Sequence, residues 1–330
     1  MPPLIRLMPR VITPVLAIAF CTVGLMNNAR ATSCPAEDLA GFVNALKDLT
    51  EVRHAHIQQP LTLQRVVIQG DQVSVRSSKA KEPVYEVDRV FALQKSNELN
   101  LIVELPDRLT IKDNSGESLI ILLFEQTDCW KLTRIEDWSL GQLLPTADAI
   151  DAAAVAIKRG DLYNRLAGEA PSNSLIALYA SALDSYLLGA RMGSAKAAYL
   201  AAGISLSGQA PQLPPKRMQD LLETAARIIP EAGITLAYFY CGERDSDSDQ
   251  SCANPEKALQ ALKDIARLDH KIALVELGNA YTSGDLTAPD APRALACYLE
   301  AQSKGATGLA DAINDLKAKG ASAQEAVHCY

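Results

Sequence analysis

Histidines and the short motifs of common enzyme classes are scarce in this 330-residue chain. It has four histidines, and it contains no glycine-rich phosphate loop, no HExxH and no GxSxG motif. Ser78 and Lys81 have the spacing of penicillin-binding serine enzymes, but neither Ser-Asp-Asn nor Lys-Thr-Gly accompanies them. The sequence therefore predicts no catalytic residue and implies no cofactor.

Positive charge is also in short supply. The net charge is -7, and the first 31 residues contain three arginines and no acid, so the remainder carries -10. Nucleic-acid binding depends largely on neutralising phosphates, and anionic lipid headgroups repel an acidic surface. Nucleic acid is therefore not an expected partner. With 48% apolar and 22% charged residues, the composition is that of a folded protein.

A hydrophobic run long enough to cross a bilayer is missing too. The run from Val11 to Met26 has 16 residues, fewer than the ~20 that a spanning helix needs. Arginines precede it, and Ala29 and Ala31 follow at the spacing that signal peptidase prefers. We therefore expect a signal peptide over residues 1–31 and no membrane span after its cleavage. The alternative is an uncleaved anchor.

Cysteines are few, but the number of cysteines after the expected signal peptide is even. An exported chain of this kind is expected to form disulfides, and the absence of a CxxC sequence argues against a redox or zinc site. Sequence alone does not choose among the possible connectivities. Their layout favours the pairs Cys34 with Cys129, Cys241 with Cys252, and Cys297 with Cys329.

Residues 32–142 combine two patterns. From Pro35 to Leu49, apolar residues recur at steps of three and four, which predicts a helix. From Arg65 to Leu140 apolar residues alternate, which predicts strands. The alternating positions are Val73 and Val75; Tyr85, Val87 and Phe91; Leu99, Leu101, Val103 and Leu105; and Leu109 and Ile111.

The turns between these strands indicate an antiparallel sheet. Gly70-Asp71 and Asp113 to Gly116 are residue types that hairpin turns favour. The unbroken apolar run Leu119 to Phe124 predicts a central strand covered on both faces. We therefore expect an α+β domain, a helix packed on an antiparallel sheet. This order resembles the nuclear-transport-factor-2-like fold, although no motif marks a family.

The aromatic residues of this region are expected in its core. They are Trp130, Trp138, Tyr85 and Phe91, and lining a ligand pocket is the alternative role. His54 and His56 would share a face of an extended segment, but two ligands do not make a metal site. We expect both histidines to face solvent.

After Pro145 alanine becomes frequent and the alternation ends, which predicts helices over residues 145–330. A set of four positions, called the frame here, then recurs along the chain: a small residue and the residues four, five and eight places after it. Small residues in such a frame let two helices approach closely, and stacked helix pairs form a solenoid. The alternative is one compact bundle. The frames are Ala197, Ala201, Ala202 and Ser205; Ala232, Leu236, Ala237 and Tyr240; and Ala273, Leu277, Gly278 and Tyr281.

The last frame and the residues after it resemble a Sel1-like repeat, a tetratricopeptide-type unit. The matching positions are Ala273, Leu277, Gly278, Tyr281, Gly284, Asp290, Arg293, Ala294, Tyr298, Ala301 and Gly305. The resemblance covers about residues 172–319 and does not extend to the first domain. Earlier units depart from it, since Ser205 replaces the aromatic residue and Gly242 comes one place early. It implies a concave surface that binds a protein or peptide.

Two further patterns in the helical half contain residue types that occur in metal or catalytic sites. Asp245, Asp247, Asp249 and Glu256 have the spacing of a calcium loop, but Gln250 stands where the sharp turn needs glycine. A solvated acidic loop is the expected reading, so no metal is predicted. His270 and His328 have no nucleophile motif beside them, and we expect them at the surface or at helix ends.

Together these features predict an exported, non-enzymatic bacterial protein, periplasmic or secreted. Its architecture would be an α+β domain over residues 32–142, followed by an all-α helical-repeat solenoid over 145–330 that binds a protein or peptide partner. One alternative is an enzyme or small-ligand binder acting on cell-wall material through a pocket in the first domain. Another is a toxin-neutralising or envelope-regulatory protein.

Overall fold

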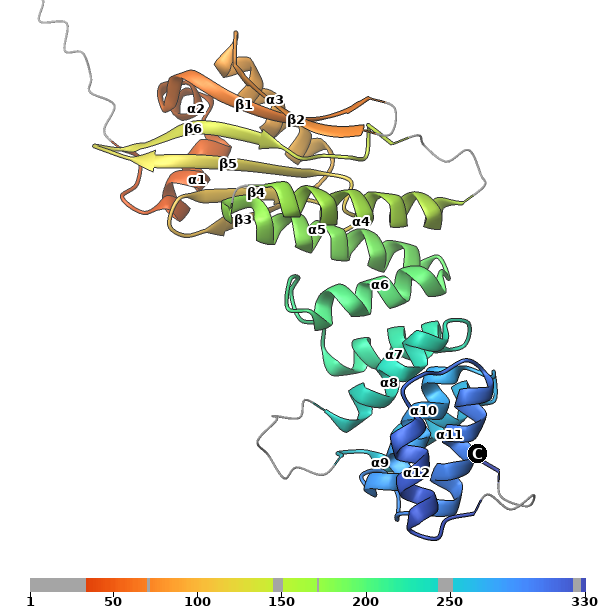
Figure 1. The fold of residues 1–330 in the computed structure, drawn as a ribbon. Helices are drawn as coiled ribbons and strands as arrows, with labels where there is room; N and C mark the ends of the chain where they lie inside the picture. The colour runs from red at the N-terminus through yellow and green to blue at the C-terminus, as the bar shows by residue number, and fades with distance from the viewer. Residues whose placement is uncertain (1–33, 70–71, 145–150, 171, 243–251, 323–327) are drawn as a thin grey trace, which may run out of the picture. The chain divides into compact units, whose positions relative to one another are not determined.

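A computed structural model describes residues 34–69, 72–144, 151–170, 172–242, 252–322 and 328–330 (Figure 1). The expected signal peptide and the turn Gly70-Asp71 lie outside these residues. The described chain begins with a six-stranded sheet and its helices and continues as a series of helices. The expected fold class, an α+β region followed by an all-α series, is confirmed.

The sheet is mixed rather than antiparallel. Its strand order is β2-β1-β6-β5-β4-β3. Every neighbouring pair is antiparallel except β1 and β6, which are parallel. The expected antiparallel sheet is therefore wrong at this pair, because it joins strands distant in sequence that no tight turn connects. The strands are β1 Ile57–Gln69, β2 Gln72–Lys79, β3 Asn100–Glu104, β4 Arg108–Lys112, β5 Leu119–Gln126 and β6 Trp130–Asp137.

One segment expected as a strand is a helix, α3 (Pro83–Ser96). Its buried residues Val87, Val90 and Phe91 are three and four positions apart, which places them on one side of a helix. Pro83 occupies its first turn, where its missing N–H costs nothing. Tyr85 consequently lies on the other side, with 60% of its surface exposed, so its expected place in the core is wrong.

Helices α1 (Leu39–Asp48) and α3 cover one face of the sheet, and the short α2 (Thr50–Ala55) follows α1. Helix α1 begins where the Asp38 carboxylate accepts a hydrogen bond from the Gly41 N–H. It contributes Leu39, Phe42, Val43 and Leu46 to the core. Trp130 lies in this same core, as expected.

Helices α4 (Ala152–Glu169) and α5 (Ser172–Arg191) contribute to a second core with residues of the sheet (Figure 1). Ile120, Leu122 and Phe124 of β5 lie in the α1–α3 core, whereas Leu119, Ile121 and Leu123 lie in the α4–α5 core. This alternation confirms that the unbroken apolar run is a strand covered on both faces. Trp138 is 1% exposed and belongs to the second core.

Polar contacts also join this helix pair to the sheet. Lys112 of β4 forms an ion pair with Asp184 of α5, with Nζ and Oδ2 2.5 Å apart. The buried Glu136 carboxylate of β6 accepts hydrogen bonds from the Ser174 hydroxyl at 2.5 Å and the Trp138 indole at 3.1 Å. The pair α4–α5 is therefore both a layer on the sheet and the start of the helical series.

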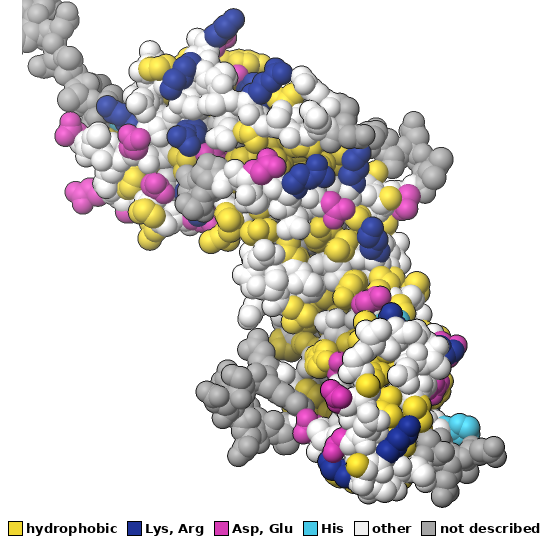
Figure 2. Space-filling view, viewed as in Figure 1, with side chains coloured by type: hydrophobic (Ala, Val, Ile, Leu, Met, Phe, Trp, Pro, Cys, Tyr) yellow, Lys and Arg dark blue, Asp and Glu magenta, His cyan; other side chains and the backbone are white. Residues whose placement is uncertain are grey.

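The series continues with helices that contact their neighbours in chain order. Each of the contacts α5 to α6, α6 to α7 and onward to α12 follows the sequence, which is the arrangement of a repeat array. Figure 2 shows hydrophobic side chains at the surface over α6, α7 and α8. The helices are α6 Ala195–Leu206, α7 Pro215–Ala226, α8 Pro230–Cys241, α9 Pro255–Ala266, α10 Lys271–Ser283, α11 Ala291–Ser303 and α12 Ala310–Ala318.

Candidate functional site

The helix pair α10–α11 is held together by a contact between a glycine and a tyrosine. A Cβ atom placed on Gly278 would lie 2.4 Å from the Tyr298 ring, so only glycine allows the ring to seat there. The Tyr298 hydroxyl then donates a 2.8 Å hydrogen bond to the side-chain oxygen of Asn279. The space left by the glycine on α10 is thus filled by an aromatic ring from α11.

The pair α4–α5 repeats this contact. A Cβ atom on Gly160 would lie 2.4 Å from the Tyr186 ring, and the Tyr186 hydroxyl donates a 2.8 Å hydrogen bond to Asp161. This pair therefore has the same construction as α10–α11, although the sequence resemblance begins only at α5. The signal that could have identified it is the spacing of Gly160 and Tyr163, which matches that of Gly278 and Tyr281.

The expected frame residues lie in three helices of the array, α6, α8 and α10. Almost all are buried, which fits their proposed role of allowing close helix approach. Tyr240 is half-buried, and its hydroxyl donates to Glu223 of α7 at 2.9 Å. Burial, followed by this bond, raises the pKa of Tyr240 to about 12. The buried members are Ala197, Ala201, Ala202, Ser205, Ala232, Leu236, Ala237, Ala273, Leu277, Gly278 and Tyr281.

Gly284, also part of the expected frame, ends α10. Its φ of +83° lies in the left-handed region, and a Cβ atom there would lie 2.9 Å from Pro289. The chain then turns to Asp290, whose carboxylate accepts from the Arg293 N–H at 3.0 Å and so caps α11. The loop between the two helices of this unit is thus defined at both ends.

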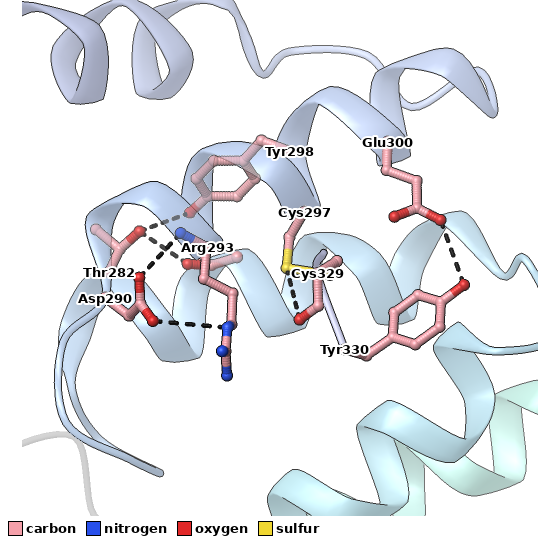
Figure 3. Close-up of a disulfide and its surroundings, with 9 residues drawn as sticks. Thr282, Asp290, Arg293, Cys297, Tyr298, Glu300, Cys329 and Tyr330 are labelled. Atoms are coloured by element: carbon pink, nitrogen blue, oxygen red, sulfur yellow. Dashed lines mark hydrogen bonds and ion pairs between the residues drawn. A yellow bond between two sulfur atoms is a disulfide. The ribbon is translucent and has the colours of Figure 1, made fainter. Parts of the chain in front are cut away.

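Three disulfides are formed among the described residues, and they join the pairs that the layout of the sequence favoured. Cys34–Cys129 ties the start of the described chain to the sheet, and Cys241–Cys252 connects the end of α8 to the residues before α9. Cys297–Cys329 holds the C-terminal residues against α11 (Figure 3). The Tyr330 hydroxyl also donates to Glu300 of that helix at 3.4 Å.

Helices α8 and α10 line a groove of about 280 Å³ within the array. Tyr238 of α8, Leu262 of α9 and Leu286 form apolar walls. Tyr238 keeps 57% of its surface exposed although it lies in this hollow. Such a groove can accept apolar side chains of a partner segment and exclude water from them.

The polar lining of the groove comes from α10 and the loop after it. Glu276, Asn279 and Ser283 occupy successive turns of the helix, and no lysine or arginine is found among the described residues that line the groove. Because the Asn279 oxygen accepts from Tyr298, its NH₂ group remains as a donor. These groups can hydrogen-bond an extended chain, but they include no pair of nucleophile and base.

A larger cavity, of about 910 Å³, lies beside α3 and the sheet. Its carboxylates include Glu86 and Asp137. Glu86 accepts from Arg65 and from Arg89, and Arg89 also reaches Asp137 at 3.4 Å. These acids are therefore held in ion pairs within the cavity wall.

The cavity has two further carboxylates near the α4 end of the sheet. Asp113 accepts backbone N–H groups of the turn after β4, and Glu117 pairs with the buried Arg159 at 3.0 Å. All four acids thus have structural partners. The cavity can hold a small polar molecule, and it is the feature that the alternative ligand-binding function would use.

His54 and His56 do not share a face. His54 lies in α2 and is bonded to Asp88 at 2.8 Å, whereas His56 follows that helix and is 6% exposed. The expectation that both face solvent is therefore wrong for His56, whose ring forms a T-shaped contact with the Phe42 ring. Burial lowers the pKa of His56 below 6.5.

The other candidate residues lie apart from one another. Ser78 belongs to β2 and, like Lys81, is exposed. His270 stands at the start of α10, and His328 is exposed. Asp245, Asp247, Asp249 and Gln250 lie outside the described residues, and Glu256 is in the first turn of α9.

Neither a metal site nor a membrane span is found in the part of the chain that the structure describes. No three His, Cys, Asp or Glu side chains among the described residues are grouped so that they could hold a metal ion. No described helix combines the length and apolar character needed to cross a bilayer.

Comparisons with known proteins give similarities in structure. No protein-family model matches the sequence, and no curated protein matches it. A Sel1 repeat protein from Oxalobacter formigenes is 20% identical over 52% of this chain and 68% of that chain, with a TM-score of 0.40. The protein c5321, a protective antigen of uropathogenic Escherichia coli strains with an SLR fold, is 18% identical over 54% of this chain, with a TM-score of 0.41. That match spans 35% of the c5321 chain.

Proposed function

We propose that this protein is an exported, non-enzymatic scaffold that binds a segment of a partner protein in the groove between α8 and α10. The observation that carries the proposal is the groove itself, because it exposes Tyr238 beside apolar walls while Asn279 and Ser283 offer hydrogen-bonding groups. Exposed aromatic side chains in such hollows are frequent anchors of protein interfaces.

The repeated helix pairs support this role. The glycine and tyrosine contacts fix the spacing within the pairs α4–α5 and α10–α11, and the second of these holds α10, which forms one wall of the groove. A preformed groove binds with little loss of conformational entropy. The Cys241–Cys252 disulfide at the end of α8 restrains one rim of the groove, since Cys241 is part of the lining.

The test uses two matched substitutions at the last residues of neighbouring helices. Ser283→Arg places a long side chain in the groove, whereas Ser303→Arg makes the same change at the end of α11, away from the groove. A photoreactive amino acid at position 238 should crosslink one defined partner from an envelope extract. Binding of the purified partner should then fall about tenfold or more with Ser283→Arg and stay unchanged with Ser303→Arg. Equal binding by both variants would contradict the proposal.

Export is a separate part of the proposal. It is supported by the three disulfides, which are typical of oxidising compartments, and by the signal-like pattern of residues 1–31. Mass spectrometry of the protein from the periplasm or medium should give a chain that begins at Thr32. A chain retained in the cytoplasm with residue 1 intact would contradict export.

The cavity beside α3 supports the alternative function, a small-ligand binder or enzyme acting on cell-wall material. Its paired carboxylates favour binding over acid–base catalysis. Incubation with muropeptides tests this alternative directly. Saturable binding that is lost in an Arg89→Gln variant would favour this alternative. The absence of both binding and turnover would count against it.

A further inference from the structure

A second cavity, of about 630 Å³, differs from the others in its charge. It is bounded by the hairpin β1–β2, by α4 and by the start of α6. Its volume lies within the range of about 300–1,000 Å³ that is common for small-molecule sites. Figure 2 shows a group of Lys and Arg side chains on the face where α4 lies.

Three cations line this cavity. Lys158 and Arg165 lie seven positions apart on one side of α4, and Lys196 lies in the first turn of α6. None of the three has an ion pair or a side-chain hydrogen bond within the described chain. By contrast, Arg65 and Arg89 of the larger cavity are both held by Glu86.

The acids in the lining are already engaged. Asp151 caps α4 by accepting from the Ala154 N–H at 3.0 Å, and Asp161 accepts from the Tyr186 hydroxyl at 2.8 Å. They therefore contribute to the helical framework. The first turn of α6 also directs the positive end of its helix dipole toward the cavity. Unpaired positive charge on a strongly acidic protein is thus concentrated here.

The remaining walls are apolar. Ile68 and Val73 come from the β-hairpin, and Ile157 and Leu162 come from α4, the helix that carries Lys158 and Arg165. A ligand that used only the cations would leave these side chains in contact with water. A hydrocarbon group that covered them would gain roughly 25 cal/mol for each Å² buried.

We propose that this cavity binds an anionic amphiphile, a molecule that joins one phosphate, sulfate or carboxylate group to a hydrocarbon portion. The anion would contact Lys158, Arg165 and Lys196, and the hydrocarbon would lie against the hairpin and α4. This site is independent of the partner groove between α8 and α10. Its ligand has the same chemistry whether it is a free amphiphile or a lipid headgroup with its chains.

The test uses the mature full-length protein and dodecyl phosphate below its micelle concentration, measured by calorimetry. Dodecyl phosphate should bind with a stoichiometry of one. Dodecyl maltoside and dodecyltrimethylammonium should not bind, and inorganic phosphate should bind at least about tenfold more weakly because it lacks the hydrocarbon. Equal binding of all three amphiphiles would overturn the proposal, as would equal binding of dodecyl and inorganic phosphate.

Matched triple variants assign the binding to the cavity. Lys158→Gln, Arg165→Gln and Lys196→Gln together should weaken dodecyl phosphate binding about tenfold or more, because charge-assisted contacts are lost. The control combines Lys216→Gln, Arg267→Gln and Lys319→Gln, which remove equal charge from surface ion pairs elsewhere. Equal weakening by both triples would overturn the assignment, and circular dichroism checks that both fold.

Vesicles distinguish the source of the ligand. Sedimentation with phosphatidylglycerol vesicles should show no charge-dependent binding if the cavity takes up a free amphiphile. Extraction of the lipid from the vesicles into a one-to-one soluble complex would also support the proposal. Vesicle binding that needs the three cations, without binding of soluble dodecyl phosphate, would overturn it in favour of a membrane-contact surface.

Discussion

Gly278 illustrates how a single missing side chain determines the spacing of two helices. Replacing Gly278 with alanine places a methyl group 2.4 Å from the Tyr298 ring, so the ring or the helix must shift. We expect a loss of about 1–3 kcal/mol in the free energy of unfolding from overpacking. Urea unfolding of the purified variant measures it.

Gly203 of α6 provides the control, since no atom lies within 4 Å of its added Cβ. Gly203→Ala should stabilise the protein by about 0.5–1 kcal/mol, because alanine is the better helix former. Similar changes in stability for the two variants would show that the Tyr298 contact does not determine the helix spacing.

His56 should make stability depend on pH. Burial lowers its pKa in the folded protein below 6.5, and the neighbouring Lys131 acts in the same direction. The unfolded chain therefore binds the proton first, so the contribution of His56 is complete above pH 6.5 and is lost as the pH falls below it. The slope from this group is at most about 1.4 kcal/mol per pH unit.

The measurement compares the wild type with His56→Gln in urea unfolding at pH 7.5 and pH 5.5. The wild type should lose more stability than the variant over this interval, because glutamine does not titrate. Identical losses would mean that His56 takes up no proton on unfolding.

Residue patterns predicted burial better than they predicted neighbours. The buried frame positions and the two tryptophans could be identified because close packing demands small or apolar side chains there. The exposure of Tyr85 could not be predicted. Tyr85, Val87 and Phe91 fit the alternation of a strand as well as Val87, Val90 and Phe91 fit the spacing of a helix. The groove lining was also beyond prediction, because the frame specifies buried positions and leaves exposed ones such as Tyr238 unconstrained.

At the scale of elements, the disulfides should differ in their contributions. The closed segments span 95, 32 and 11 residues for Cys34–Cys129, Cys297–Cys329 and Cys241–Cys252. Loop-closure entropy then predicts contributions of about 4.7, 3.7 and 2.8 kcal/mol. Unfolding of three variants, each with one pair changed to alanine, should follow this order. A larger loss from the shortest loop than from the longest would contradict it.

Element pairing was the part that sequence could not supply. The parallel contact of β1 with β6 joins segments separated by α3 and four strands, and no local residue signals it. The pair α4–α5 was missed as a unit of the array for a related reason. The spacing of Gly160 and Tyr163 is its one local signal, and the Gly160–Tyr186 contact that defines the pair becomes visible only when the two helices lie together.

At the scale of the whole molecule, the sheet and the first helix pair share one core. Leu119, Ile121 and Trp138 of the sheet region pack in the same cluster as residues of α4 and α5. A fragment of residues 34–144 would expose these side chains, so it should aggregate or bind a hydrophobic dye. A fragment of residues 34–191 should be monomeric and folded.

Size-exclusion chromatography and near-ultraviolet circular dichroism compare the two fragments. A monomeric, natively packed 34–144 fragment would show that the sheet region is complete without α4 and α5. It would then support the proposed division into residues 32–142 and 145–330 as independent domains.

Hydrogen exchange of the full mature protein, with and without its crosslinked and purified partner, tests the central claim most directly. The partner should slow amide exchange in α8, in α10 and in the loop that contains Leu286, because these segments line the groove. Exchange in β1 to β6 should stay unchanged. Slowing confined to residues 57–137, with α8 and α10 unaffected, would contradict the account and place the function in the sheet.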